Sequence, residues 1–188
     1  LFRQAHYDTL TGLPNRALLT DRLEQAMLRA DRFKRHCAIL FVDLDGFKAI
    51  NDTLGHHMGD TFLSTAASRL REAARAADSV VRFGGDEIVV LVSDLSPEDD
   101  LAASLSATAE RLIEALSQPV ELAGQRLALG ASIGIAIYPG DGGNGAALLR
   151  NADAAMYNAK ARGRGHAEFY VEKMNRNVFE RLAMQQDL

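Results

Sequence analysis

The stretch SVVRFGGDEIVVLV at residues 79–92 decides the fold, because it contains two apolar strands on either side of a short turn. Residues 79–83 and 88–92 are rich in Val and Ile, which favour strands. The intervening GGDE gives the backbone the freedom that a tight hairpin turn requires. The sequence therefore predicts an antiparallel hairpin at the centre of a sheet.

Strands and helices alternate on both sides of this hairpin. CAILFVDL at residues 37–44 is a short apolar run typical of a buried strand. Apolar residues recur at helical spacing in other segments, which predicts helices over 16–34, 59–76, 97–117 and 145–162. Residues 126–139 are predicted to form a strand or one arm of a hairpin, and residues 166–170 a final strand. This mixture predicts an α/β fold with a ferredoxin-like βαββαβ core, a mainly antiparallel central sheet flanked by helices.

Composition limits the function classes. The chain has 188 residues, of which 47% are hydrophobic, enough for one domain with its own core. A single Cys excludes a disulfide framework and indicates a reducing compartment, the cytoplasm. The net charge of −4 argues against a nucleic-acid partner, and no apolar run is long enough to span a membrane, so no membrane contact by this domain is expected.

Both ends of the chain are predicted to be helical linkers. Residues 1–7 resemble the last turns of a helix and do not begin with Met. In residues 172–188, Met174, Val178 and Leu182 recur every four residues, which predicts an amphipathic helix. We therefore expect a domain at 8–171 with neighbouring domains on both sides, which would allow the full-length protein to be tethered to a membrane.

Carboxylates gather at the ends of two predicted strands. Asp43 and Asp45 end the strand at 37–44, and Asp86 and Glu87 follow the hairpin glycines. If the two strands pair, Asp43, Asp86 and Glu87 converge, and a hard divalent cation such as Mg²⁺ would offset their repulsion. The alternatives are that Asp43 caps a loop and that the hairpin acids are solvated. Gly84 and Gly85 also leave room for a flat ring or a phosphate beside the backbone.

Two further groups of side chains suit a nucleotide. Lys160 and Arg164 are four residues apart at a helix C-terminus, where they either clamp a polyphosphate or complement the helix dipole. A region rich in loops follows the predicted metal site, and an Asn amide with an Asp carboxylate there can read the edge of guanine. Its candidate residues are Lys48, Asn51, His56 and Asp60.

Five segments together resemble the GGDEF family, the diguanylate cyclases. They are DTLTGLPNR (8–16), FVDLDGFKAINDTLGHHMGD (41–60), RFGGDEI (82–88), SIGIAIYP (132–139) and ADAAMYNAKARGR (152–164). The resemblance implies a fold like nucleotide cyclases and polymerase palms, and condensation of two GTP into cyclic di-GMP and two pyrophosphates. The metal-assisted attack of a 3′-hydroxyl on an α-phosphate would occur between two domains, so a homodimer is expected. The C-terminal segment is similar to linkers that lead to an EAL phosphodiesterase domain, and a sensor domain is expected upstream.

The resemblance also implies roles for individual residues. Asp43, the backbone carbonyl of Leu44, Asp86 and Glu87 would bind Mg²⁺ or Mn²⁺, with Asp86 as proton acceptor and Glu87 in the same catalytic cluster. The remaining matches are guanine-side contacts at Asn51, His56 and Asp60, and triphosphate contacts at Lys48, Lys160 and Arg164, with Gly84 and Gly85 at the substrate. Arg75 and Asp78 match an RxxD site for product inhibition by cyclic di-GMP, although a helix-end Arg followed by an Asp has the same pattern.

The chain departs from the family pattern at Ile88, where the family has Phe. Because Ile88 alternates with Glu87, it is expected to face the core and to cost only some packing. Two other functions remain open. One is a GTP-binding regulatory domain, weak or inactive as an enzyme, that controls an attached EAL phosphodiesterase. The other is a cyclic di-GMP receptor that acts through Arg75 and Asp78.

Overall fold

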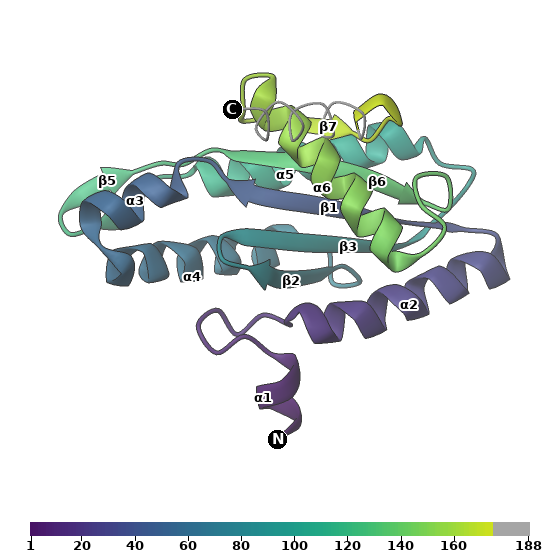
Figure 1. Cartoon of the computed structure of the whole chain (residues 1–188), viewed down its shortest axis with the longest axis horizontal. Helices are drawn as coiled ribbons and strands as arrows, with labels where there is room; N and C mark the ends of the chain where they lie inside the picture. Colours follow the sequence, from purple (N-terminus) through teal and green to yellow (C-terminus); the bar gives the residue numbers. More distant parts are fainter. Residues whose placement is uncertain (175–188) are drawn as a thin grey trace, which may run out of the picture.

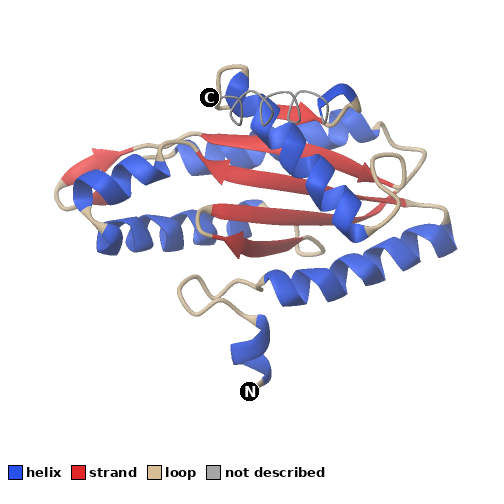
Figure 2. Cartoon of the chain, in the orientation of Figure 1, coloured by secondary structure: helices blue, strands red, loops and turns tan. Residues whose placement is uncertain are grey.

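The computed structural model describes residues 1–174, in which helices and strands alternate along the chain (Figures 1 and 2). The elements are α1 (Phe2–His6), α2 (Arg16–Phe33), β1 (His36–Leu44), α3 (Phe47–Leu54), α4 (His56–Ala73), β2 (Ser79–Gly84), β3 (Glu87–Leu95), α5 (Leu101–Ser117), β4 (Val120–Leu122), β5 (Gln125–Leu127), β6 (Ala131–Tyr138), α6 (Gly145–Ala161) and β7 (Ala167–Phe169).

The main sheet has the strand order β2-β3-β1-β6-β7. Its pairs are antiparallel except β6 with β7, which is parallel. The path β1-α4-β2-β3-α5-β6 through this order is the ferredoxin-like βαββαβ core, so the predicted fold class is confirmed. A separate two-stranded sheet is formed by β4 and β5.

Helices cover both faces of the sheet (Figure 1). Helices α2 and α6 pack on one face, and α4 and α5 pack on the other. The central strand β1 is therefore buried on both sides, which explains its continuous apolar sequence. Ile88 is fully buried on the face covered by α4 and α5, as predicted from its alternation with Glu87.

The region between residues 48 and 60 is helical, so the prediction that it is rich in loops is wrong. It consists of α3 and the first turn of α4, separated by Gly55 alone. Gly46 and Gly55 both have positive φ values, 80° and 89°, and they delimit α3 as turn residues. Lys48 and Asn51 therefore lie on α3, while His56 and Asp60 lie on α4.

Other element boundaries also differ from the prediction. Helix α5 begins at Leu101 because the Asp100 side chain accepts a hydrogen bond from the Ala103 amide as an N-cap. The segment 126–139, predicted as a strand or a hairpin arm, is divided into β5 and β6, and β5 forms an antiparallel hairpin with β4 instead of joining the main sheet. Strand β1 ends at Leu44, so Asp45 lies outside it.

The two predicted linkers are described to different extents. Helix α1 lies within residues 1–7, as expected. The helix predicted over 172–188 lies outside the described residues from position 175 onward. Within residues 1–174, no helix is both long and apolar enough to cross a membrane.

Candidate active site

The hairpin tip is braced by an arginine that the sequence analysis missed. The turn between β2 and β3 consists of Gly85 and Asp86, and Gly85 has a φ of 52°. The Arg82 guanidinium donates hydrogen bonds to the Gly85 carbonyl oxygen at 3.2 and 3.0 Å, and to Asp8 Oδ1 at 2.9 Å. Asp8 lies in the DTLTGLPNR segment, and the resemblance of this segment to the family was the available sequence signal that Asp8 has a role near the site. Arg82 thus fixes the turn to the N-terminal loop.

Asp43 lies at the end of β1, next to the hairpin. It pairs in register with Glu87 of β3, as the sequence predicted for these neighbouring strands. Its side chain is buried, with 7% of the residue exposed. Oδ2 lies 2.5 Å from Lys160 Nζ, whereas Oδ1 has no hydrogen-bond partner among the described residues. Burial raises the pKa of Asp43 to about 6, Asp86 adds to the rise, and Lys160 opposes it.

Glu87 is influenced by a second acid that the sequence analysis missed. Burial raises the pKa of Glu87, and the negative charges of Asp153 and Asp86 raise it further. Asp153 is on α6, two helical turns before Lys160. Although it reaches solvent, the surrounding protein raises its pKa by desolvation. Asp153 lies in the segment 152–164 that resembles the family, and this match was the available sequence signal for its place at the site.

The donor set fits a hard divalent cation. An unpartnered, buried carboxylate oxygen on Asp43, with Asp86 nearby, offers the oxygen ligands that Mg²⁺ prefers. The predicted convergence is only partly realised, however. Within residues 1–174 no three Asp, Glu, His or Cys side chains are already grouped to hold a metal ion. Lys160 instead provides the positive charge beside Asp43.

Lys160 and Arg164 do not both lie on the last turn of a helix, contrary to the prediction. Helix α6 ends at Ala161, so Arg164 lies beyond it with a φ of 59°. Gly163, with a φ of 122°, turns the chain away from the helix axis. Lys160 therefore faces Asp43 from the last turn of α6, and Arg164 occupies the loop before β7.

The four guanine-side and phosphate-side candidates lie on α3 and α4, which pack together. Lys48, His56 and Asp60 are exposed, whereas Asn51 is half-buried between the helices. A Cβ atom built on Gly59 would lie 1.7 Å from Asn51 Oδ1. The Asn51 carboxamide therefore occupies the space that a larger residue at position 59 would fill.

The RxxD residues lie beside a basic cleft. The Asp78 carboxylate accepts a hydrogen bond from the Arg75 amide at 3.2 Å, and burial raises the pKa of Asp78. The cleft has a volume of about 390 Å³. Its lining includes Arg75, Asp78 and three further arginines, Arg3, Arg22 and Arg71. The structure thus places several cations where an anionic ligand can enter.

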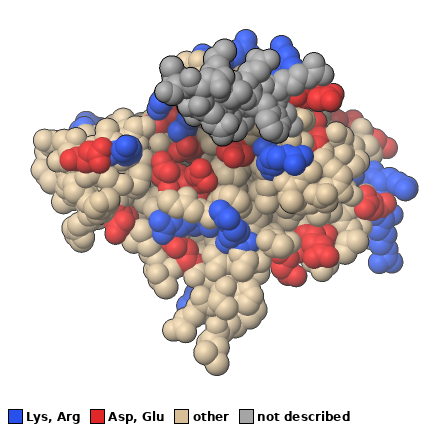
Figure 3. Space-filling view, in the orientation of Figure 1, with Lys and Arg blue, Asp and Glu red and all other residues tan. Residues whose placement is uncertain are grey.

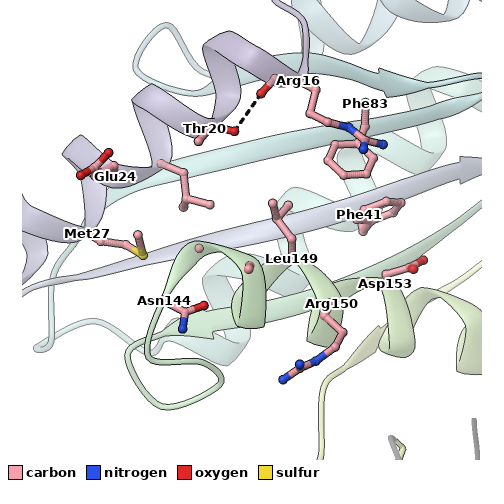
Figure 4. A pocket seen from close by; sticks show the side chains of 13 residues that line it. Arg16, Thr20, Glu24, Met27, Phe41, Phe83, Asn144, Leu149, Arg150 and Asp153 are labelled. Carbon is pink, nitrogen blue, oxygen red and sulfur yellow. Dashed lines mark hydrogen bonds between the residues drawn. The ribbon is translucent and has the colours of Figure 1, made fainter. Parts of the chain in front are cut away.

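A larger cleft of about 690 Å³ lies between α2 and α6 (Figure 4). Phe41, Phe83 and Leu149 form part of its apolar lining. The Arg16 guanidinium lies 3.9 Å from the centroid of the Phe83 ring, a cation–π contact. Asp153, which influences Glu87, also lines this cleft. On this side of the molecule, Figure 3 shows acidic groups gathered near the middle with Lys and Arg around them.

The protein-family model described as the diguanylate cyclase GGDEF domain matches residues 5–166 of the chain. The chain therefore belongs to the GGDEF domain family. It is 50% identical over 188 residues to the bifunctional diguanylate cyclase/cyclic di-GMP phosphodiesterase MucR of Pseudomonas aeruginosa. That match covers 100% of this chain but 27% of MucR, so the chain spans only part of its relative.

Solved structures show the same fold. The GGDEF domain of TpbB from Pseudomonas aeruginosa superposes with a TM-score of 0.86 at 40% identity, covering 92% of this chain and 99% of that one. The coiled coil and GGDEF domain of DgcB from Caulobacter crescentus, in complex with c-di-GMP, gives a TM-score of 0.79 at 28% identity. That match covers 89% of this chain and 87% of the DgcB chain.

Proposed function

We propose that this domain is a diguanylate cyclase that condenses two GTP into cyclic di-GMP and two pyrophosphates in the cytoplasm. The observation that carries the proposal is the buried Asp43, paired in register with Glu87 at the hairpin tip and left with one unpartnered oxygen. Such a carboxylate suits a cation bound together with substrate phosphates. Membership of the family and the names of its relatives point to the same reaction.

In this proposal, Asp43, the Leu44 carbonyl, Asp86 and Glu87 hold Mg²⁺, with Mn²⁺ as an alternative. When bound, the metal supplies positive charge for the phosphates and favours ionisation of the attacking hydroxyl. Asp86, half-buried in the turn beside Asp43 and Glu87, accepts the proton of the 3′-hydroxyl. Gly84 and Gly85 expose the backbone to the substrate without a Cβ atom.

The other residues bind the nucleotide. Asn51 and Asp60 present an amide and a carboxylate on packed helices, a donor and acceptor combination that suits guanine, and His56 lies at the start of the same helix. The phosphate chain is bound by Lys48, Lys160 and Arg164. The Lys160 ammonium group now lies beside the Asp43 carboxylate, where the metal ion would bind. Lys160 must therefore move away from Asp43 when the metal ion and the phosphates bind.

Catalysis in this proposal needs a homodimer. Each domain holds one GTP, and the hydroxyl of one nucleotide attacks the α-phosphate of the other, so an isolated domain has half of a site. Activity should therefore rise more steeply than linearly with protein concentration. Fusion to a dimerising coiled coil should remove this dependence by raising the effective concentration.

The test is formation of cyclic di-GMP from GTP and Mg²⁺ by the coiled-coil fusion. Asp86→Asn should lower the rate by about 100-fold or more, because it removes the proton acceptor and a metal ligand. Asp99→Asn is the matched control, since Asp99 is an exposed acid in the loop before α5. Near-normal turnover by Asp86→Asn would refute the assigned role.

A second candidate is a GTP-binding domain that regulates an attached EAL phosphodiesterase without turnover. The ion pair between Lys160 and Asp43, at the position proposed for the metal, favours this candidate, and the name of the relative MucR supports an attached phosphodiesterase. It predicts GTP binding without product in the fused dimer, and GTP-dependent phosphodiesterase activity in the full-length protein.

The basic cleft at Arg75 and Asp78 favours cyclic di-GMP binding, as an inhibitory site or as a receptor. Arg75→Ala should abolish inhibition by added product.

A further inference from the structure

The loop after α6 has an unusual backbone. Gly163, Arg164 and Gly165 have φ values of 122°, 59° and 68°, so three successive residues lie in the left-handed region. The Arg164 amide donates to the Ala159 carbonyl at 3.0 Å, which together with Gly163 forms a Schellman-type helix end. Arg164 is the only one of the three with a side chain, and this conformation is costly for it. Contacts elsewhere must hold the loop in place.

Asp45 provides one of these contacts. Its Oδ2 accepts a hydrogen bond from the Gly165 amide at 3.0 Å. The Ser132 hydroxyl donates to the same carboxylate, at 2.8 Å from Oδ1 and 3.1 Å from Oδ2. Ser132 is fully buried on β6, and its hydroxyl satisfies its hydrogen-bonding requirement through Asp45. Asp45 thus joins the end of β1, the start of β6 and the loop of Arg164.

His166 holds the same peptide group from its other side. Its Nδ1 lies 2.9 Å from the Arg164 carbonyl oxygen, and its Nε2 lies 2.9 Å from Glu168 Oε1. With a proton on Nδ1, His166 donates to the Arg164 C=O, while Asp45 accepts from the Gly165 N–H, so the peptide unit between Arg164 and Gly165 is bonded at both its polar atoms. This fixes the plane of that unit and with it the direction from which the Arg164 side chain leaves the backbone.

We propose that Asp45 is a positioning residue that pre-orders Arg164 for the phosphate chain of the nucleotide. Both Asp45 oxygens accept hydrogen bonds from protein groups, which distinguishes Asp45 from Asp43 with its unpartnered oxygen. A loop flanked by two glycines otherwise loses conformational entropy when an anion binds, and a loop already ordered avoids that cost. The inference rests on the proposed role of Arg164 in phosphate binding.

The test is equilibrium binding of 3′-deoxy-GTP with Mg²⁺, because this nucleotide lacks the attacking hydroxyl and cannot react. Asp45→Ala should weaken its binding about tenfold, the effect of losing one hydrogen bond to a charged group. Binding of GMP, which lacks the terminal phosphates, should change less than twofold. Asp45→Asn keeps one acceptor oxygen and should show an intermediate loss.

Coupling to Arg164 separates positioning from general damage to the fold. In the double variant Asp45→Ala with Arg164→Ala, binding of 3′-deoxy-GTP should be no weaker than with Arg164→Ala alone. Additive losses, an equal loss for GMP, or unchanged binding by the Asp45 variants would overturn the inference. If Asp45→Ala does not fold, as judged by circular dichroism, the same cycle with Asp45→Asn decides by the same criteria.

The outcomes also separate this inference from the function on which it rests. If Arg164→Ala binds 3′-deoxy-GTP like the wild type, the proposed phosphate contact itself is refuted. If Arg164→Ala weakens binding but the Asp45 variants do not, the contact stands and only the positioning role fails. Ser132→Ala removes the second tie to Asp45 and should give a smaller loss than Asp45→Ala.

Discussion

Asp43 should lower the stability of the fold at neutral pH. Its pKa is raised from 3.8 to about 6, so between these values the folded state retains a proton that the unfolded state has lost. Stability should therefore fall as pH rises through this window. Asp43→Asn, which has no charge to desolvate, should raise the free energy of unfolding at pH 7.5 by about 1 kcal/mol and abolish product formation.

The gain from Asp43→Asn should vanish at pH 3.5, where Asp43 is protonated in the folded state. Thermal unfolding at the two pH values measures this difference. Asp99→Asn serves as the control for removing one acidic charge. A variant no more stable than wild type at pH 7.5 would mean that Lys160 compensates fully for the burial of Asp43.

Ile88 is the residue at which the chain departs from its family. Because Ile88 is buried, we expect its substitution to change the stability of the fold and not the chemistry of the site. Because it is fully buried among α4 and α5, Ile88→Phe adds volume to a filled core. The variant should lose about 1–3 kcal/mol in stability, with no increase in the rate of cyclic di-GMP formation. A large increase in that rate would instead show that the Ile limits catalysis.

At the level of elements, the α3–α4 pair holds Asn51 in place by means of a glycine. A Cβ atom at position 59 would overlap the Asn51 carboxamide, which is the end of a movable side chain. Gly59→Ala should therefore weaken GTP binding about tenfold by displacing that amide. Thermal stability should change little, because Ala favours the helix over Gly by about 1 kcal/mol.

Fluorescence titration with a labelled GTP measures this effect, and Ser68→Ala on the exposed side of α4 is the matched control. Unchanged binding by Gly59→Ala would remove Asn51 from the guanine site.

The sequence predicted most of the elements, because its strong signals are local. The glycines of the hairpin, the apolar run of β1 and the spacing of α2, α4 and α6 each specify an element without help from distant residues. The predictions failed where an element was short or where the hydrogen-bond partners of a residue were distant in the sequence. Phe47, Ile50 and Leu54 have helical spacing, but α3 has only 8 residues, and this region was predicted to be rich in loops. Asp45 was noted only as a second carboxylate at the strand end, because Ser132 and Gly165 are its neighbours only in space.

For the whole molecule, the site depends on how closely α6 approaches the sheet. A Cβ atom on Gly134 of β6 would lie 2.0 Å from the Ala152 carbonyl oxygen and 2.2 Å from the Met156 nitrogen. These are backbone atoms of α6, which cannot move singly. Gly134→Ala should therefore destabilise the domain by about 3 kcal/mol or more and abolish GTP binding, since α6 carries Lys160.

Chemical denaturation of Gly134→Ala measures this loss. Gly143→Ala is the control, because a Cβ atom there meets open space. A variant of normal stability would indicate that α6 can shift outward, and its GTP affinity would then report whether Lys160 moved with the helix.

The tie made by Asp45 also has a consequence for the order of events during synthesis. Asp45 is separated from Ser132 by 87 residues and from Gly165 by 120 residues. During synthesis, Asp45 therefore leaves the ribosome long before Ser132 or Gly165 does. The strands of the sheet can begin to pair, but the loop of Arg164 can bond to Asp45 only after α6 and Gly165 have been synthesised. Under the proposed function, an incomplete chain should thus lack the ordered Arg164 loop that would bind the phosphates of the nucleotide.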